Sequence, residues 1–155
     1  MIIIAHRGNL EGPNAELENT PDQLRFCIDR GFDVEVDIWF KNGTWWLGHD
    51  APTYEVDIDF IKEISYRTWW HAKTIPTVVK LKELARTSVD IAYAVHYFFH
   101  QEDDVTLTSR GWLWTFPGKE LTEHSICVMP EIDKDYPEGC AGVCTDFAQR
   151  YRRGK

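Results

Sequence analysis

The first fifty residues bring together side chains that could bind a metal ion and cleave a phosphodiester. His6 and Arg7 end a short apolar run, and Glu35 and Asp37 alternate with valines. His49 follows a tryptophan-rich segment. An imidazole can act as general base or general acid near neutral pH, and a guanidinium can hold a phosphate through two N–H donors. Carboxylate oxygens are the ligands that Mg²⁺ and Ca²⁺ prefer. These residue types therefore indicate metal-assisted chemistry on a phosphate ester.

The carboxylate pair belongs to an alternating segment, residues 33–40, which is typical of a β-strand. In such a strand Glu35, Asp37 and Trp39 face one side, and the aliphatic residues between them face the other. Burying two carboxylates on one face costs free energy unless a cation compensates. The pattern therefore favours a cation site, and a solvated strand face is the alternative interpretation.

Several polar side chains follow strand-like runs. In barrels and doubly wound sheets, the C-terminal ends of the strands form the site, and His6, His49, His71 and Lys73 lie at such ends. His71 and Lys73 share parity, so both can point into one site, with Lys73 as a cation for phosphate. The alternatives are a purely structural histidine and a lysine that extends to water.

The second half of the chain holds further polar residues at the ends of expected strands. Residues 100–104, which begin with His100, are expected to form a solvated loop, although a supporting role at the rim stays open. Glu131 and Asp146 also end strands. Asp146 can equally cap the last turn, so the sequence alone gives it no role.

Local signals predict two helices. Thr20, Pro21 and Gln23 form a helix start with Thr20 as the N-cap. Gly31 is the expected end of that helix. A second helix is expected over residues 77–86, where apolar residues recur at helical spacing.

Strands that alternate with helices and connectors favour a parallel sheet, with one hairpin at Asn42 and Gly43. About seven strands suggest a closed barrel, but 155 residues fall short of the roughly 200 that such barrels usually need. We therefore expect one α/β domain over residues 1–155, a small, truncated TIM-type (β/α) barrel with several outer helices missing or reduced to loops. The expected strands lie at residues 2–5, 33–40, 44–47, 68–73, 90–99, 112–116, 125–129 and 141–145.

The composition fits a globular domain, with 43% hydrophobic and 27% charged residues. A net charge of −8 disfavours nonspecific binding to nucleic acid or to an anionic membrane. No apolar run approaches the roughly 20 residues that span a bilayer, and we see no secretory signal. The four cysteines are expected to be reduced thiols of a cytoplasmic protein. Trp39, Trp112 and Trp114 are candidates to line a pocket, with core packing as the alternative.

Several motifs, taken in order, resemble the glycerophosphodiester phosphodiesterase family, within the wider group that includes phosphatidylinositol phospholipase C. The motifs of the first fifty residues are His6-Arg7-Gly8, Glu18-Asn19-Thr20, Glu35-x-Asp37 and His49-Asp50. Trp114-Thr115 and the segment from Gly142 to Asp146 are similar to the family's seventh and closing strands. Because both ends of the chain match, the resemblance implies a whole, shortened barrel.

The resemblance also implies a role for each matched residue. It implies a divalent metal, Mg²⁺ or Ca²⁺, and a small phosphodiester substrate. The expected roles are acid–base catalysis for His6 and His49, metal binding for Glu35 and Asp37, phosphate binding for Arg7 and Lys73, and support for Glu18 and Trp114.

The sequence departs from the family at one position. The family usually carries an acidic ligand two residues before the lysine that Lys73 matches, and here that position is His71. If His71 ligates the metal, the preference moves toward Mn²⁺ or Zn²⁺. The other interpretation is that metal binding is weak.

Two other functions stay open. A sphingomyelinase D-like phospholipase is one, although such proteins are secreted with disulfides, which the missing signal and the cysteine pattern disfavour. The other is a non-catalytic barrel that binds a phosphate ester, which the change to His71 favours. A barrel short of helices would expose apolar sheet surface, so a homodimer is also expected.

Overall fold

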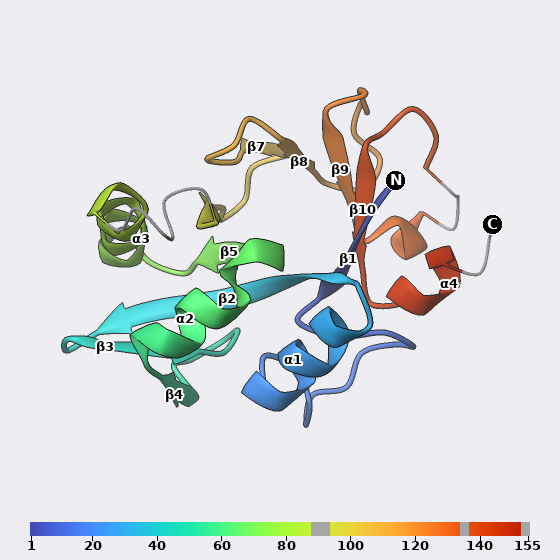
Figure 1. Cartoon of the computed structure of the whole chain (residues 1–155). Coiled ribbons are helices and arrows are strands. Elements are labelled where there is room, and N and C mark those ends of the chain that lie inside the picture. Colours follow the sequence, from blue (N-terminus) through green and yellow to red (C-terminus); the bar gives the residue numbers. More distant parts are fainter. Residues whose placement is uncertain (88–93, 134–136, 153–155) are drawn as a thin grey trace.

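The computed structural model describes residues 1–87, 94–133 and 137–152. It has a mixed α/β structure in which one curled sheet is accompanied by few helices (Figure 1). The strands are β1 (Ile2–His6), β2 (Asp33–Lys41), β3 (Thr44–Leu47), β4 (Tyr54–Val56), β5 (Thr68–Ala72), β6 (His96–Phe99), β7 (Val105–Leu107), β8 (Leu113–Thr115), β9 (Ser125–Val128) and β10 (Gly142–Thr145).

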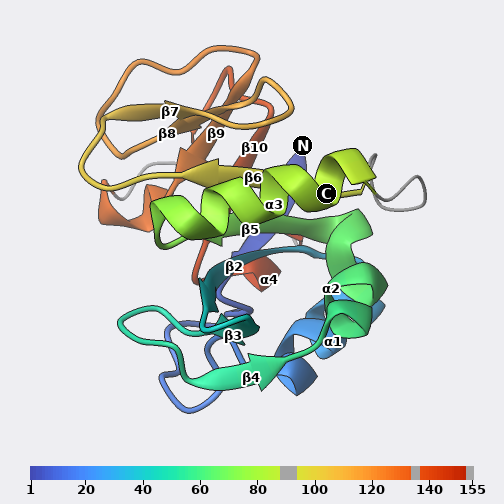
Figure 2. The same cartoon turned by 90° about the vertical axis from the view of Figure 1, so that its left-hand side faces the viewer.

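Parallel pairing runs through most of the sheet. In order across it, β6, β5, β2, β1, β10, β9 and β8 are parallel to their neighbours. The antiparallel strands β3 and β4 extend from the C-terminal half of β2, and β7 pairs antiparallel with β8. Just after β7, the Ser109 amide donates to the Tyr97 carbonyl of β6 at 2.8 Å. This bond brings the two ends of the parallel run together, so the sheet curls (Figure 2).

The helices that pack on the sheet contact four of its parallel strands, β1, β2, β5 and β6. α1 begins where the sequence predicts, because the Thr20 hydroxyl accepts a hydrogen bond from the Gln23 amide at 3.3 Å. Gly31 follows its end with φ +81°, a conformation that glycine adopts without strain. α1 and α3 pack on β2, α3 also on β5 and β6, and α4 on β1. The helices are α1 (Pro21–Asp29), α2 (Ile58–Ile64), α3 (Ile75–Thr87) and α4 (Ala148–Arg152), with a 3-10 turn η1 at Ser65–Arg67.

Strand alternation divides the core between the two faces of the sheet. The outer cluster fills the space under the helices and includes Val34, Val36 and Ile38 of β2, as the alternation predicts. The inner cluster lies on the opposite face, inside the curl. Its fully or nearly fully buried members are Ile4, Trp69, Phe98, Trp114, Ile126, Val128 and Cys144.

Two structural predictions need correction or extension. The strand predicted over residues 90–99 begins only at His96, because Ala94 and Val95 are outside any strand, and residues 90–93 lie outside the described residues. The elements β4, α2, β7 and α4 were not predicted. The reduction of outer helices is confirmed at the β8–β9 connection, residues 116–124, which contains no helix. The described part of the next connection holds only the 3-10 turn η2 (Pro130–Ile132).

The four cysteines are free, and Cys27, Cys127 and Cys144 are buried. This agrees with the prediction of unpaired thiols. In the described parts of the chain, no helix combines the length and the apolar character needed to cross a membrane.

Candidate active site

A cavity of about 570 Å³ opens at the C-terminal ends of the parallel strands. Most of the residues predicted from the sequence line it, including both histidines of the predicted acid–base pair. Among the residues with an expected catalytic, binding or supporting role, the exceptions are Asp37 and Glu18, which lie behind the lining residues and bond to them. The lining consists of His6, Arg7, Glu35, His49, His71, Lys73, His100, Gln101, Trp114, Phe116, Val128 and Met129.

Strand periodicity explains why residues so far apart in sequence converge here. Residues two positions apart on a strand face the same side, so in six of the parallel strands a site residue lies two positions beyond a residue of the inner cluster. The pairs are Ile4 and His6, Trp69 and His71, Phe98 and His100, Trp114 and Phe116, Ile126 and Val128, and Cys144 and Asp146.

His6 is held by a carboxylate from the other end of the chain. Its Nδ1 donates to Asp146 Oδ1 at 2.8 Å, and its Nε2 lies 3.9 Å from Glu35 Oε2. Burial lowers the pKa of His6, but the hydrogen bond to Asp146 and the charge of Glu35 outweigh burial and raise it. The ring therefore has a fixed orientation with Nε2 toward the cavity.

Asp146 is itself positioned by two further residues. Its backbone amide donates to Glu131 Oε1 at 2.9 Å, and its Oδ1 accepts from the Asn9 side chain at 2.8 Å. Burial raises the pKa of Asp146, but the hydrogen bond and charge of His6, the hydrogen bond from Asn9 and the charge of Arg7 together outweigh burial and lower it. Asp146 therefore does not merely cap the last turn, because it is the carboxylate partner of His6.

His49 is oriented in the same way by Asp37. Its Nδ1 lies 3.1 Å from Asp37 Oδ2 and 3.3 Å from Lys73 Nζ. The ring comes from the loop after β3, and it is the more exposed of the two predicted catalytic histidines. His6 and His49 thus share one arrangement, in which Nδ1 bonds a carboxylate and the ring lines the cavity. The second nitrogen, Nε2, lies 3.9 Å from Glu35 Oε2 in His6 and 3.7 Å from Asp50 Oδ1 in His49.

Asp37 is fully buried and lies at the centre of a network of donors. Its Oδ2 accepts from Asn19 at 3.0 Å and its Oδ1 from Lys73 Nζ at 3.1 Å. Burial raises the pKa of Asp37, but hydrogen bonds from His49 and His71 and the charge of Lys73 outweigh burial and hold it well below its usual value. Asp37 is therefore ionised, as a metal ligand must be.

Glu35, Asp37 and His71 form the one cluster among the described residues whose ligand atoms could surround one ion, since these atoms all lie within 4.8 Å of one another. His71 Nδ1 lies 3.3 Å from Glu35 Oε1 and 3.1 Å from Asp37 Oδ1. Ligands of one octahedral ion at about 2.1 Å from it lie about 3 Å apart, so the spacing fits.

The second nitrogen of His71 also fits a metal ligand. Its Nε2 lies 3.3 Å from the carbonyl oxygen of His100, and a ligating histidine usually donates its other ring N–H to such an acceptor. Burial lowers the pKa of His71, but bonds to Asp37 and Glu35 outweigh burial and raise it to about 9. Without an ion, a protonated His71 therefore balances the same two carboxylates.

Arg7 is placed to bind an anion. Its Nη1 donates to Glu18 Oε2 at 3.2 Å, so Glu18 contacts a residue that lines the cavity. Its Nε is buried and makes no hydrogen bond, although it lies 3.2 Å from Asp37 Oδ2, because the angle is unsuitable. The guanidinium therefore lies between two carboxylates at the edge of the cavity.

Backbone strain is concentrated around the site. Four non-glycine residues of the described chain have positive φ, and Asn42 occupies the hairpin turn. The other three are Arg7, Asn19 and Met129, at φ +52°, +59° and +47°. Such conformations persist only where the surroundings impose them, and they cluster at functional sites.

Sequence reasoning missed several residues of the site. Asn9 and Glu131 act through Asp146, and their roles depend on pairing between the first and last strands. His100, Gln101, Phe116 and Met129 line the cavity, so His100 is not part of a purely solvated loop. Its parity with Phe98 could have indicated this.

Two of the three tryptophan candidates do not line the cavity. Trp39 donates from Nε1 to the Gly48 carbonyl at 2.6 Å and supports the turn before His49. Trp112 packs against Trp69, with ring centroids 6.4 Å apart. Only Trp114 among the three is a lining residue.

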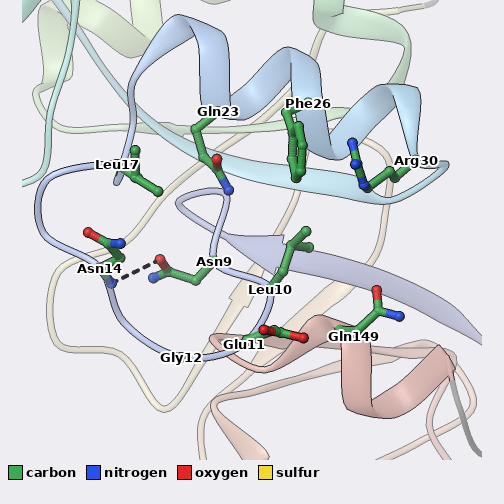
Figure 3. A pocket seen from close by; sticks show the side chains of 10 residues that line it. All are labelled: Asn9, Leu10, Glu11, Gly12, Asn14, Leu17, Gln23, Phe26, Arg30 and Gln149. Carbon is green, nitrogen blue, oxygen red and sulfur yellow. Dashed lines mark hydrogen bonds between the residues drawn. The ribbon is translucent and has the colours of Figure 1, made fainter.

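A second cavity of about 570 Å³ lies between α1, the loop after β1 and α4 (Figure 3). Its charged lining residues are Glu11 and Arg30, and Gln23 and Gln149 add amides. The catalytic-type side chains line the first cavity, and the two cavities share no lining residue. The first cavity is therefore the candidate active site.

Comparison of the chain with protein-family models, with curated proteins and with solved structures finds no match.

Proposed function

We propose that the chain is a metal-assisted phosphodiesterase that acts on a small, glycerophosphodiester-like substrate, built on a truncated TIM-type barrel. One observation carries the proposal. His6 and His49 are each anchored through Nδ1 to a carboxylate, and both rings face the cavity that Arg7 and Lys73 also line. Two oriented imidazoles beside two cations are the groups that phosphodiester cleavage by acid–base catalysis needs.

The cations account for substrate binding. Both Arg7 and Lys73 line the cavity, and Lys73 Nζ lies 3.1 Å from Asp37 Oδ1. A phosphodiester carries one negative charge, which Arg7 can hold through two N–H donors. Lys73 adds a second positive charge, which stabilises the charge on the phosphate oxygens as it grows in the transition state.

Glu35, Asp37 and His71 would hold the divalent ion. We expect Mg²⁺ or Ca²⁺ from the two carboxylates, with Mn²⁺ or Zn²⁺ favoured by the imidazole. When bound, such an ion polarises the phosphate and stabilises developing negative charge.

The histidines would move the protons. One imidazole accepts the proton of the attacking hydroxyl as its oxygen bonds to phosphorus. The other donates a proton to the leaving alkoxide as the second P–O bond breaks. Asp146 and Asp37 keep each ring oriented while its charge changes, because each accepts from the Nδ1 side.

Hydrolysis of bis(p-nitrophenyl) phosphate and of glycerophosphodiesters tests the proposal. Wild type, His6→Ala and His49→Ala would be assayed with chelator and with each divalent ion, and His124→Ala, at an exposed position, is the control. We expect metal-dependent turnover that falls by about 10²-fold or more in both site variants and is unchanged in the control. Equal turnover in all four proteins would contradict the proposal. A choline phospholipid in the substrate panel tests the phospholipase alternative.

A phosphate-ester-binding barrel without turnover is the second candidate. It is favoured by the donors already present on Asp37, since Lys73 Nζ and His71 Nδ1 each lie 3.1 Å from the same oxygen. The protein can thus neutralise its carboxylates without an ion. Calorimetric binding of glycerol phosphate, unaffected by chelator and without turnover under any ion, would favour this candidate.

A further inference from the structure

The cavity has two unlike halves. The half formed by β1, β2, β5 and the loop after β3 carries the charged side chains described above. The opposite half comes from strands β8 and β9 and from the residues that directly follow β6, β8 and β9. Its lining residues are His100, Gln101, Trp114, Phe116, Val128 and Met129.

The aromatic residues of this second half are fixed by other rings. Phe116 stacks on His100, with centroids 4.4 Å apart. Trp114 contacts Phe98 at 4.5 Å and Trp69 at 5.8 Å between centroids. Because these rings already pack against one another, the wall is rigid and is formed before a ligand binds.

The backbone conformation at Met129 also places this residue in the wall. Met129 has φ +47°, and its amide donates to the Cys144 carbonyl at 2.7 Å. A left-handed methionine is strained, and the strain places a flexible apolar side chain in the cavity beside Val128. Met129 can therefore adapt to apolar groups of different shape.

The charge distribution excludes one class of ligand from this half. Among the described residues, no carboxylate lines it, and Glu35 lies on the other side with His71 and His6. A cationic group such as choline would lack a counter-charge here. Trp114 is 3% exposed, so its ring has little free surface with which to bind a cation.

We propose that this wall binds an apolar substituent on one ester oxygen of the substrate. The substrate class is then a phosphodiester in which one alcohol carries an alkyl chain or an aromatic ring, while the charged half holds the phosphate. This inference rests on the proposed function, and it names the group that gives specificity. Phe116 and Met129 are specificity-determining residues, and a small polar or cationic alcohol is a poor substituent.

A matched substrate series tests the inference. Three phosphodiesters share p-nitrophenol as leaving group and carry methyl, butyl or phenyl as the second ester, so only the retained group differs. For wild type we expect kcat/KM to be about 10-fold or more higher for butyl or phenyl than for methyl. The butyl and phenyl arms distinguish an alkyl chain from an aromatic ring as the preferred group.

Two variants locate the effect. Phe116→Ala removes a ring of the wall, and Met129→Gly removes a side chain while keeping a residue that tolerates positive φ. Each should reduce the butyl-to-methyl or phenyl-to-methyl ratio of kcat/KM by several-fold. Leu107→Ala, at an exposed position of β7, should leave every ratio unchanged.

The outcomes separate this inference from the proposed function. Turnover with equal kcat/KM for the three esters would overturn the inference and leave the function standing. Absence of all turnover would overturn the function, and calorimetry with phenyl phosphate and methyl phosphate then decides the inference. Tighter binding of phenyl phosphate that is lost in Phe116→Ala supports it, and equal affinities, or no binding of either, overturn it.

Discussion

At the scale of single residues, Asp146 is the group that orients His6. It accepts from His6 Nδ1 at 2.8 Å and, with the charge of Glu35, raises the pKa of His6 against the effect of burial. In Asp146→Asn the negative charge is lost. We therefore expect the pKa of His6 to fall and kcat/KM to drop by about 10²-fold or more. NMR titration of the His6 ring and the pH dependence of kcat/KM measure the two effects.

Asp29→Asn provides the matched control for this substitution, because Asp29 is exposed at the end of α1 and distant from the cavity. It should alter neither the titration nor the rate. If His6 titrates at the same pH in Asp146→Asn as in wild type, Asp146 does not set its protonation.

His71 should decide which ion the site prefers. His71→Glu would supply a third carboxylate in place of an imidazole, so we expect the affinity for Mg²⁺ or Ca²⁺ to rise by about 10-fold or more. His71→Gln, which removes the imidazole without adding charge, is the control. Calorimetric titration of Mg²⁺, Ca²⁺, Mn²⁺ and Zn²⁺ into the three proteins measures this. Equal affinities in the Glu and Gln variants would show that this position does not contact the ion.

The sequence predicted most of the residues around the cavity because each lies at a strand end with the correct parity. His6, Glu35 and His71 could be placed in this way from local patterns alone. The supporting residues could not, because their partners are far apart in sequence. Asn9 and Asp146, for example, meet only when β1 and β10 pair, across a separation of 137 residues.

At the scale of elements, α1 and the loop before it hold the first strand end in place. The Thr20 hydroxyl accepts from the Gln23 amide, and the neighbouring Asn19 side chain bonds Asp37. Thr20→Ala removes the cap and should lower the free energy of unfolding by about 1 kcal/mol. Urea denaturation measures the change. Thr20→Ser keeps a capping hydroxyl and should stay close to wild type, and an equal loss in both variants would mean that the cap is not the cause.

Elements with strong local signals were predicted, and some of the short elements were not. The cap of α1 and the Asn42-Gly43 turn depend on neighbouring residues, so the sequence shows them directly. β4 and β7 have three residues each, and their pairing partners in β3 and β8 determine them. The start of β6 was also missed, since the predicted strand over residues 90–99 begins only at His96.

At the scale of the whole molecule, the curl of the sheet depends on the contact between β6 and the segment that includes β7. The Ser109 amide donates to the Tyr97 carbonyl at 2.8 Å, and the Ser109 hydroxyl accepts from the Tyr97 amide at 2.9 Å. His96 Nε2 and Thr108 Oγ1 are 2.8 Å apart. The sequence predicted a shortened barrel but not this contact, because hydroxyl and imidazole groups in loops carry no periodic signal.

This contact makes stability depend on the protonation of His96. Burial, with a smaller effect of the Arg110 charge, lowers the pKa of His96 from 6.5 to about 3. The unfolded chain therefore binds one more proton than the folded protein between these values. The stability that neutral His96 provides is complete above pH 6.5 and is lost as the pH falls toward 3, by up to about 1.4 kcal/mol per pH unit.

Urea denaturation across this range should show a steeper decline for wild type than for His96→Gln, whose side chain cannot titrate. His124→Gln, at an exposed histidine, should follow wild type. Parallel curves for wild type and His96→Gln would mean that His96 is accessible to protons in the folded state and that the sheet does not depend on its neutral form.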